Sequence, residues 1–472
     1  PDHPSSLGAS DLFDQASILG LYDPDRSQTV TYLESPRSWE AFVGDLQPKL
    51  AAQEGLRGAG LRILVENSSS PTTIAQLDRI RERFPEAGIH FWDPAGLDNA
   101  RAGARIALGQ PAHVHFDLAR ADIVVTLDAD LLTDGPGAVR YARDFAARRR
   151  VVEDDHHMNR LYSIESTPTN TGTLADHRLS VSPAQLEGFA RALASAVGVG
   201  VPGRATAELE PWLQALARDL QAHRGRSLVV AGDHCPPELH ALALAINGAL
   251  GNFGETVLLT EPVMAHEGSG VDSLRDLVSD LDAGRVDMLV MVGGNPAYDA
   301  PADLNFVESL QKAETRIRVG RQAGDETGRW CQWQVPVSHW LEAWGDIRSH
   351  DGTVSLVQPL IEPLYRTRSA DQVLATIGGD EGTSDYDLVR STWFDGFGVT
   401  EKQWRRWLHD GIADAADPVA VTASVDAAAV REAAGPPGGA ASLSVSFRPD
   451  PTIGTGEWAN NGWLQECPKP HT

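Results

Sequence analysis

The chain has 472 residues, in which 40 Lys and Arg stand against 65 Asp and Glu, for a formal net charge of −25. At about 150 residues per domain, this length predicts roughly three folding units. So acidic a chain repels the phosphate backbone, which argues against nucleic acid as a partner. No apolar stretch reaches about 18 residues, so we predict no direct membrane span.

Cysteine is scarce, with only Cys235, Cys331 and Cys467 in the chain. No two of them have CxxC spacing. Three thiolates cannot fill the four ligand positions of an iron–sulfur cubane or of a Cys₄ zinc site. The cysteine pattern therefore predicts no iron–sulfur cluster and no metal centre in this chain.

The first 60 residues show no clean period, although short helices are expected within 5–20 and 39–52. From residue 61 the pattern becomes that of a parallel α/β block, in which short apolar runs alternate with helical spacing. Its expected elements are strands 62–66, 89–92, 123–127 and 160–165 and helices 74–84, 137–150 and 182–197.

A second α/β block follows a boundary expected near Gln221–Gly225. Its expected elements are strands 227–231, 256–260, 288–292 and 315–319 and helices 237–250, 271–283 and 304–313.

Beyond Ile377 the pattern loosens. Residues 413–441 are rich in Ala, Gly, Asp and Pro, which favours a flexible insertion, and Ser442–Phe447 alternates like a strand. We therefore predict an α/β protein with two Rossmann-like doubly wound domains and a partly β C-terminal region. The predicted division is an N-terminal segment 1–60, domains 61–222 and 223–377, and a C-terminal region 378–472.

Candidate functional residues lie where the predicted strands end, because ligands of doubly wound sheets bind beyond the carboxyl ends of the strands. Four such ends combine small and polar residues: Asn67–Thr72, Glu165–Gly172, Gly232–His234 and Gly293–Asp299. None is a GxGxxG fingerprint or a phosphate-binding loop, so each is either a plain turn with a good helix cap or a remnant of a nucleotide-type cleft. The cleft candidates are Ser70, Thr72, Glu165, Thr167, Asn170, Asp233, His234 and Asn295.

Other motifs favour structural interpretations. The run Glu153–His157 has metal-ligand side chains, but adjacent residues rarely point at one ion, so a solvated acidic loop is expected. Chain neighbours also diverge at His234 and Cys235, so nucleophilic catalysis is not expected there. The Trp-rich stretches 330–344 and 393–407 indicate core or interface packing, with Cys331 a buried, inert thiol.

Several motifs resemble those of molybdopterin oxidoreductases. Pro1–Gly8 resembles their "GNPxHPxSxG" segment, and Gly293-Gly294-Asn295-Pro296 resembles their "GxNPxxSxP" turn. One branch is more similar still, the B subunit of bacterial alternative complex III, a quinol:electron-acceptor oxidoreductase. The motifs that match this branch are Met158–Tyr162, Asp325–Thr327, Leu341–Asp346, Asp351–Val354 and Asn460–Glu466.

The resemblance implies a molybdopterin-oxidoreductase fold that holds no molybdenum cofactor. In the family this half is joined to a ferredoxin-like half, which carries the iron–sulfur clusters. The chain begins inside the family pattern and stops after Cys467-Pro468, so it is expected to be one part of the subunit. The implied partners are that ferredoxin-like half, multihaem cytochrome c subunits bearing haem c, and an integral membrane quinol-binding subunit. The implied location is the periplasmic face of the bacterial inner membrane.

The resemblance also bears on the cleft. Ser166-Thr167-Pro168 stands where active relatives have "DPR", which removes an arginine. We therefore interpret the cleft as vestigial, with no catalytic residue and no cofactor in this chain. Two alternatives stay open: a true molybdopterin-dependent reductase of the polysulfide or formate type, and an unrelated nucleotide-binding α/β protein.

Overall fold

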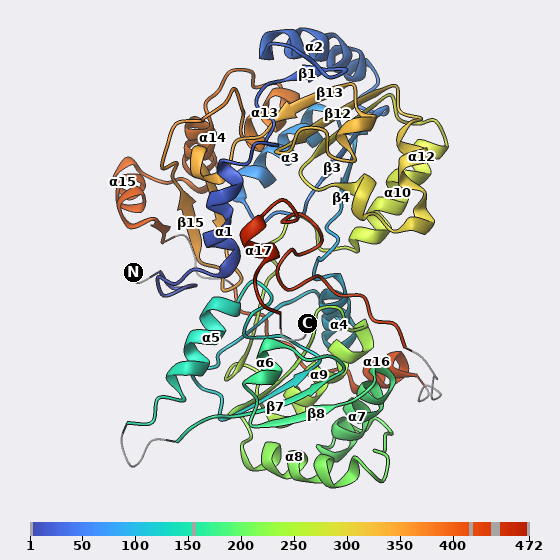
Figure 1. The fold of residues 1–472 in the computed structure, drawn as a ribbon, viewed down its shortest axis with the longest axis vertical. Helices are drawn as coiled ribbons and strands as arrows, with labels where there is room; N and C mark the ends of the chain where they lie inside the picture. Colours follow the sequence, from blue (N-terminus) through green and yellow to red (C-terminus); the bar gives the residue numbers. More distant parts are fainter. Residues whose placement is uncertain (1–2, 153–156, 415–418, 436–443, 470–472) are drawn as a thin grey trace.

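A computed structural model describes residues 3–152, 157–414, 419–435 and 444–469. The chain forms two lobes (Figure 1). The lower lobe contains residues 98–260 and a late helix, and the upper lobe contains the segments before and after them. The predicted acidic loop Glu153–His157 lies outside the described residues except for His157, which is exposed.

A seven-stranded sheet forms the centre of the upper lobe, in the order β2-β1-β13-β12-β11-β3-β4. The five strands from β13 to β4 run parallel, and β1 and β2 add an antiparallel edge. The strands are β1 Thr31–Tyr32, β2 Ser35–Pro36, β3 Leu61–Val65, β4 Gly88–Phe91, β11 Met288–Val292, β12 Thr315–Gly320 and β13 Trp333–Pro336.

Helices cover both faces of this sheet, because β3 and β11 are fully buried apolar runs that must be shielded on two sides. Ile63 and Val65 pack with α2, α3 and α13, whereas Leu64 packs with α10 and α12. The helices of this lobe are α1 Leu12–Leu21, α2 Trp39–Gly55, α3 Pro71–Arg83, α10 Gly270–Asp282, α11 Pro296–Asp299, α12 Phe306–Leu310 and α13 Ala370–Gly378, with short 3₁₀ turns η1 Ala302–Leu304, η2 Gly328–Trp330 and η3 Trp340–Glu342.

The lower lobe is built on a parallel four-stranded sheet in the order β8-β7-β6-β9, beside an antiparallel pair, β10 and β5. One apolar core joins this sheet to its helices. The strands are β5 His113–Phe116, β6 Ile123–Leu127, β7 Arg160–Glu165, β8 His177–Ser180, β9 Ser227–Ala231 and β10 Val257–Thr260, and the helices are α4 Asp98–Leu108, α5 Ala138–Ala147, α6 Asn170–Thr173, α7 Pro183–Ala196, α8 Glu210–Ala222, α9 Pro237–Leu250 and α16 Ala427–Ala434.

A small antiparallel sheet, β14-β15-β16, adjoins the upper lobe. Its core contains Trp393, Trp404 and Trp407, which are all buried, so the Trp-rich stretch 393–407 packs as predicted. The elements are β14 Gly345–Arg348, β15 Val354–Val357, β16 Ile412–Ala413, α14 Asp385–Ser391, the π-helical turn η4 Thr392–Gly396 and α15 Glu401–Asp410. In the other stretch Trp333 and Cys331 are buried, but Trp330 and Trp340 are exposed.

The predicted α/β fold with parallel sheets is confirmed, but the strand pairing cuts across the predicted domain boundaries. β3 belongs to the first predicted domain, 61–222, but pairs with β11 of the second. Likewise β9 belongs to the second predicted domain, 223–377, but pairs with β6 of the first. The lower lobe is thus inserted between two parts of the upper sheet. Apolar periodicity identifies a buried strand but not its neighbour, because pairing depends on contacts far apart in sequence.

The C-terminal region also differs from its prediction. The described residues Ser444–Phe447 form no strand, and Phe447 is 87% exposed. Within the range predicted to be a flexible insertion, the described helix α16 buries Val430 and Ala434 in the lower core, so this part is packed. The last segment, with α17 Gly462–Gln465, runs between the lobes in red (Figure 1). Among the described residues, no helix is both long and apolar enough to cross a lipid bilayer.

Candidate functional site

Asp128 stands at the carboxyl end of β6 and organises the lower edge of the interlobe region. Its backbone has a φ of +58°, which is uncommon for a residue with a side chain. The buried carboxylate accepts hydrogen bonds from the Ser166 amide (2.9 Å) and hydroxyl (2.8 Å) and lies 3.4 Å from Nε2 of His234. Burial alone would raise the pKa of Asp128, but hydrogen bonds from His234, Arg448 and Ser166 lower it well below its usual range.

Arg448 reaches this edge from the C-terminal segment, 320 residues away in sequence. Its guanidinium forms an ion pair with Asp128 and donates to the Ser166 hydroxyl at 2.6 Å. The same segment contacts the upper lobe, where Asn461 donates to the Ala16 carbonyl of α1 at 2.8 Å. The chain's own C-terminal segment therefore occupies space between the lobes beyond the lower strands.

The loop after β7 is held by carboxylates rather than left open. Glu165 is buried, accepts from the Thr169 hydroxyl at 2.7 Å and pairs with Arg178. Asp130 accepts from the Thr171 amide at 2.8 Å and its hydroxyl at 2.6 Å. Of the other predicted residues here, Thr167 and Asn170 are half-buried, and the Asn170 side chain donates a long hydrogen bond of 3.5 Å to the Thr133 hydroxyl.

The N-terminus of α3 is occupied by a carboxylate of the chain itself. Asp346 accepts from the Ser70 hydroxyl (2.5 Å), from the Thr72 amide (3.1 Å) and hydroxyl (2.6 Å), and from the Trp393 indole (2.9 Å). A helix N-terminus is a ready site for an anionic ligand. Here the buried Asp346 supplies that negative charge, so Ser70 and Thr72 serve tertiary packing.

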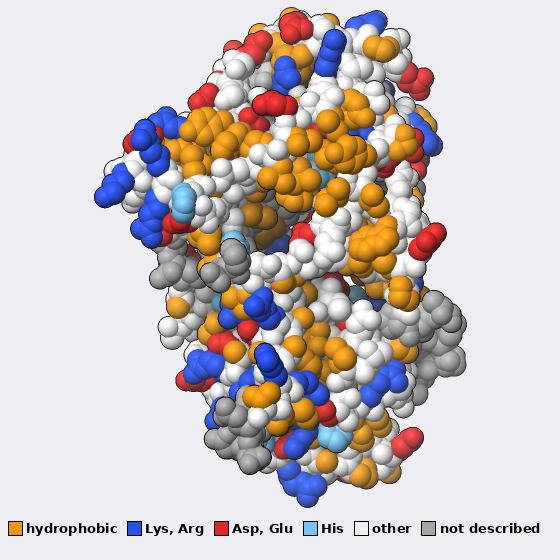
Figure 2. All heavy atoms as spheres, turned by 60° about the vertical axis from the view of Figure 1, so that its left-hand side comes forward, with side chains coloured by type: hydrophobic (Ala, Val, Ile, Leu, Met, Phe, Trp, Pro, Cys, Tyr) orange, Lys and Arg blue, Asp and Glu red, His pale blue; other side chains and the backbone are white. Residues whose placement is uncertain are grey.

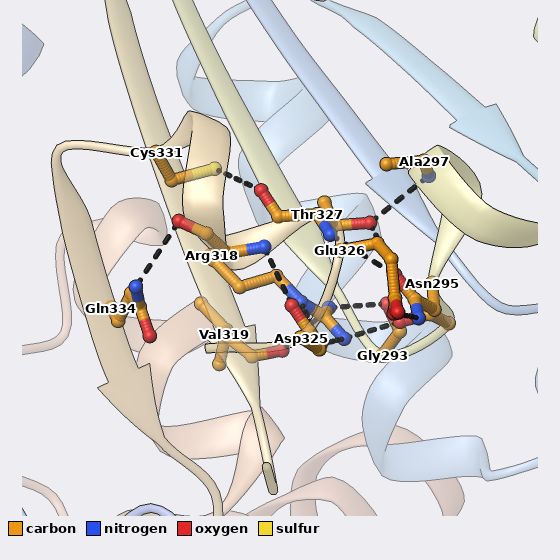
Figure 3. Close-up of polar contacts among 12 residues, drawn as sticks. Gly293, Asn295, Ala297, Arg318, Val319, Asp325, Glu326, Thr327, Cys331 and Gln334 are labelled. Atoms are coloured by element: carbon orange, nitrogen blue, oxygen red, sulfur yellow. Dashed lines mark hydrogen bonds and ion pairs between the residues drawn. The ribbon is translucent and has the colours of Figure 1, made fainter. Parts of the chain in front are cut away.

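Asn295 is fixed by the loop after β12, as Figure 3 shows. Its amide donates to Glu326 at 2.7 Å, and its carbonyl oxygen accepts from the Thr327 amide (3.1 Å) and hydroxyl (2.7 Å). The Thr327 hydroxyl oxygen in turn accepts from the Ala297 amide at 3.0 Å. Both ends of the Asn295 side chain are therefore occupied.

Arg318 contacts the same turn through its guanidinium (Figure 3). It pairs with Asp325 at 2.8 Å, with both side chains 6% exposed, and donates to the carbonyls of Gly293 and Gly294. Burial raises the pKa of the neighbouring Glu66, and the charge of Asp93 adds to that rise. This strand end thus has a paired arginine and several nearby carboxylates.

One open cavity of about 130 Å³ lies beside the lower strand ends. Asp233 lines it, and burial together with the charge of Asp134 raises the pKa of Asp233 to about 6. His240 and His350 also line it, each 7% exposed, and His240 Nε2 and His350 Nδ1 have no hydrogen-bond partner among the described residues. Burial lowers the pKa of His240 to about 4. The cavity therefore presents neutral imidazoles in a mostly apolar wall.

The predicted site residues thus divide between the two sheets. Glu165, Asp233 and His234 gather at the lower strand ends, whereas Ser70, Thr72 and Asn295 belong to the upper sheet. Sequence reasoning missed Asp128, Asp346 and Arg448 as site residues. The position of Asp128 directly after a buried strand was a usable signal, but no local pattern connects Arg448 to it.

The fold places the chain among α/β proteins with the architecture of molybdopterin-type enzymes. Acetylene hydratase from Pelobacter acetylenicus superposes with a TM-score of 0.63 at 13% sequence identity, over 86% of this chain and 69% of that one. The molybdopterin-binding-like subunit of menaquinone reductase from Nitratidesulfovibrio vulgaris is 24% identical in an alignment of 426 positions that covers 81% of this chain and 61% of the relative. The chain thus spans about three fifths of this curated relative's length. No family model matches the sequence.

The strand ends fit a molybdopterin cofactor poorly. Such a cofactor is anionic, through its phosphates and dithiolene sulfurs, and favours unpaired cations and free helix N-termini. Here three arginines near the strand ends are paired: Arg178 with Glu165, Arg318 with Asp325, and Arg448 with Asp128. Asp346 occupies the N-terminus of α3, and the buried carboxylates of Asp128 and Glu165 lie at the ends of β6 and β7. Like charges placed in contact cost several kcal/mol, so these carboxylates would disfavour the anionic groups of the cofactor.

Proposed function

We propose that this chain is a non-catalytic, cofactor-free scaffold within a quinol-linked electron-transfer complex, as the molybdopterin-oxidoreductase-like part of the iron–sulfur subunit of alternative complex III. In this role it holds partner subunits in place on the periplasmic face of the membrane. Electrons pass from quinol toward cytochrome c-type or oxidase acceptors through iron–sulfur clusters and haems outside this chain.

One observation carries the proposal: the chain's own side chains occupy strand ends that face the space between the lobes. Arg448 is bound at Asp128 and Ser166, and Asp346 is bound at the start of α3. Positions suited to anionic ligands are therefore satisfied internally. The sequence similarity supports the quinol-linked setting, because the relative is named as a subunit of a menaquinone reductase.

An exposed apolar surface supports the scaffold role. It comprises side chains that are 45–76% exposed: Ile18, Leu19, Tyr22, Trp340, Leu360 and Leu364. Two contacts place them together, from His339 to the Ser17 carbonyl (3.0 Å) and from the Leu360 amide to the Leu341 carbonyl (2.8 Å). Figure 2 shows apolar side chains gathered over the upper lobe. Contiguous exposed apolar groups of this kind mark protein–protein surfaces, and we assign this one to a partner subunit of the complex.

A molybdopterin-dependent oxidoreductase is the second candidate. The cavity beside Asp233 favours it, because His240 and His350 offer unpartnered nitrogens that a bound ligand would satisfy.

The deciding experiment is metal and pterin analysis of the complex purified from membranes. The scaffold function predicts iron but neither molybdenum nor releasable pterin. About one molybdenum with one or two pterins per chain would overturn it and establish the second candidate.

A second experiment tests the partner surface. We expect Leu19→Glu to abolish co-purification of partner subunits while the chain still accumulates. Leu174→Glu, at a 56% exposed position of the lower lobe, is the matched control and should assemble normally. Normal assembly of the Leu19 variant would remove this surface from the proposal.

A further inference from the structure

Three side chains with different metal-ligand atoms meet at the carboxyl ends of β6 and β9. The ligand atoms of Asp128, His234 and Cys235 all lie within 4.8 Å of one another. His234 Nε2 is 3.4 Å from Asp128 Oδ2 and 3.8 Å from Cys235 Sγ. The sequence predicted that the side chains of His234 and Cys235 would diverge. The structure corrects that prediction, because a tight turn directs both toward Asp128.

The fold builds this convergence from two neighbouring parallel strands. Leu127 of β6 is in register with Ala231 of β9, so the residues that follow each strand emerge side by side. The Gly232 amide donates to the Leu127 carbonyl at 3.0 Å, and the Cys235 amide closes a turn onto the Gly232 carbonyl at 2.8 Å. A side chain at Gly232 would overlap the Asp128 carbonyl oxygen, so glycine permits this close approach.

Two of the three separations between ligand atoms lie close to those of a tetrahedral zinc site, and the third, from the Cys235 sulfur to the Asp128 carboxylate, is within 4.8 Å. With Zn–N and Zn–O near 2.0–2.1 Å and Zn–S near 2.3 Å, neighbouring ligand atoms stand roughly 3.3–3.6 Å apart. The observed 3.4 and 3.8 Å separations need only shifts of a few tenths of an ångström. A carboxylate, an imidazole and a thiolate are together a donor set suited to Zn²⁺, with water as the fourth ligand.

Arg448 is bound to the Asp128 carboxylate, which would also be a ligand of the metal ion. Its guanidinium pairs with Asp128 Oδ2, the oxygen that faces His234. A guanidinium and a divalent cation at one oxygen repel each other, so only one of them can be held there at a time.

We propose that Asp128, His234 and Cys235 form a Zn²⁺ site, and that Zn²⁺ and the Arg448 segment are competing occupants of it. When the ion binds, the Cys235 S–H bond is replaced by an S–Zn bond and the proton passes to solvent. Arg448 then leaves Asp128, and the C-terminal segment is released from the lower strand ends. The two proposals have separate tests: Co²⁺ and Zn²⁺ binding decide this one, whereas molybdenum and pterin content decide the scaffold proposal.

The test uses the full chain and Co²⁺ as a spectroscopic substitute for Zn²⁺. One equivalent of Co²⁺ should give a thiolate-to-metal charge-transfer band that Zn²⁺ abolishes. Cys235→Ser should eliminate the band, and His234→Gln should weaken Co²⁺ binding by at least about tenfold. Cys331→Ser and Cys467→Ser are matched controls and should keep the band. A band that survives Cys235→Ser, or no band in the unmodified chain, would overturn the site.

Two further measurements test the competition. Arg448→Met should tighten Zn²⁺ binding by about tenfold or more, because the competing cation is gone. Zn²⁺ should also speed chymotryptic cleavage after Phe447 in the unmodified chain but not in Cys235→Ser or His234→Gln. Unchanged affinity in Arg448→Met, or cleavage insensitive to Zn²⁺, would refute the competition. The His234 variant keeps the test informative should the Cys235 variant fold poorly, because its imidazole is closer to solvent.

Discussion

The Asp346 carboxylate accepts a hydrogen bond from the Thr72 backbone amide, 3.1 Å away, although the two residues are 274 positions apart in sequence. The contact joins β14 to the first turn of α3. It places a fixed negative charge where the helix dipole is positive, which stabilises both elements. It also closes a position that could otherwise receive an anionic ligand.

The first prediction concerns this carboxylate. Asp346→Ala leaves four donors without their acceptor: the hydroxyls of Ser70 and Thr72, the Thr72 amide and the Trp393 indole. Each buried group left unpaired costs about 1–3 kcal/mol, so the four together should lower the free energy of unfolding, measured by urea denaturation, by at least about 4 kcal/mol. Asp303→Ala, at an exposed position, should change stability by less than about 0.5 kcal/mol. Similar losses in both variants would contradict this account.

The second prediction concerns the buried ion pair of Arg26 and Glu342, whose side chains are 2% and 0% exposed. Arg26→Met leaves the buried Glu342 carboxylate without its partner and should lower the free energy of unfolding by about 3–5 kcal/mol. Adding Glu342→Gln removes that charge and keeps an acceptor oxygen for one of the two amides that the carboxylate binds, those of His339 and Leu364, so the double variant should be more stable than Arg26→Met alone. Arg57→Met breaks an exposed pair and should cost under about 1 kcal/mol. The idea fails if the double variant is the less stable of the two.

The third prediction concerns pH. Burial lowers the pKa of His115 to about 4, with a further contribution from His350 that Asp351 and Asp117 oppose. In the unfolded chain this imidazole takes up a proton near pH 6.5, so the unfolded state binds more protons between pH 6.5 and 4. The stabilisation is therefore complete above pH 6.5 and is lost as the pH falls toward 4, by about 3 kcal/mol.

Urea midpoints measured between pH 7 and 4 test this, with His115→Gln expected to flatten the profile. His409→Gln, where the side chain is 88% exposed, controls for the substitution itself. A His115 variant whose profile is as steep as that of the unmodified chain would rule out this imidazole as the cause.

The fourth prediction compares two glycines. Gly232→Ala places a methyl group against the Asp128 carbonyl oxygen, so the backbone must shift and stability should fall by about 2–4 kcal/mol. Gly188 lies within α7 with open space around it, so Gly188→Ala should raise stability by about 0.5–1 kcal/mol. Opposite signs in thermal unfolding are the expected result. Equal losses of stability in the two variants would mean that the close approach of Gly232 to the Asp128 carbonyl does not account for the effect of a side chain there.

Sequence patterns located the helices and strands well where a short segment carries a clear apolar pattern. β6, β7, β9, α9 and β11 begin and end where the pattern predicted. Elements with weaker apolar signals were not predicted, among them α4, α8 and the short strands β5 and β8. β8 has exposed and half-buried residues, so its pattern resembles that of a loop.

The sequence by itself determined which short apolar segments become strands, because a run such as Met288–Val292 must be buried on both faces. It also determined the acidic charge and a cysteine supply too small for a cubane cluster. Three features could be seen only in the folded chain. They are the pairing of the strands, the position of Asp346 at the start of α3, and the contact of Arg448 with Asp128 across 320 residues. Local patterns describe neighbours a few positions apart, whereas these contacts arise only when distant segments pack against one another.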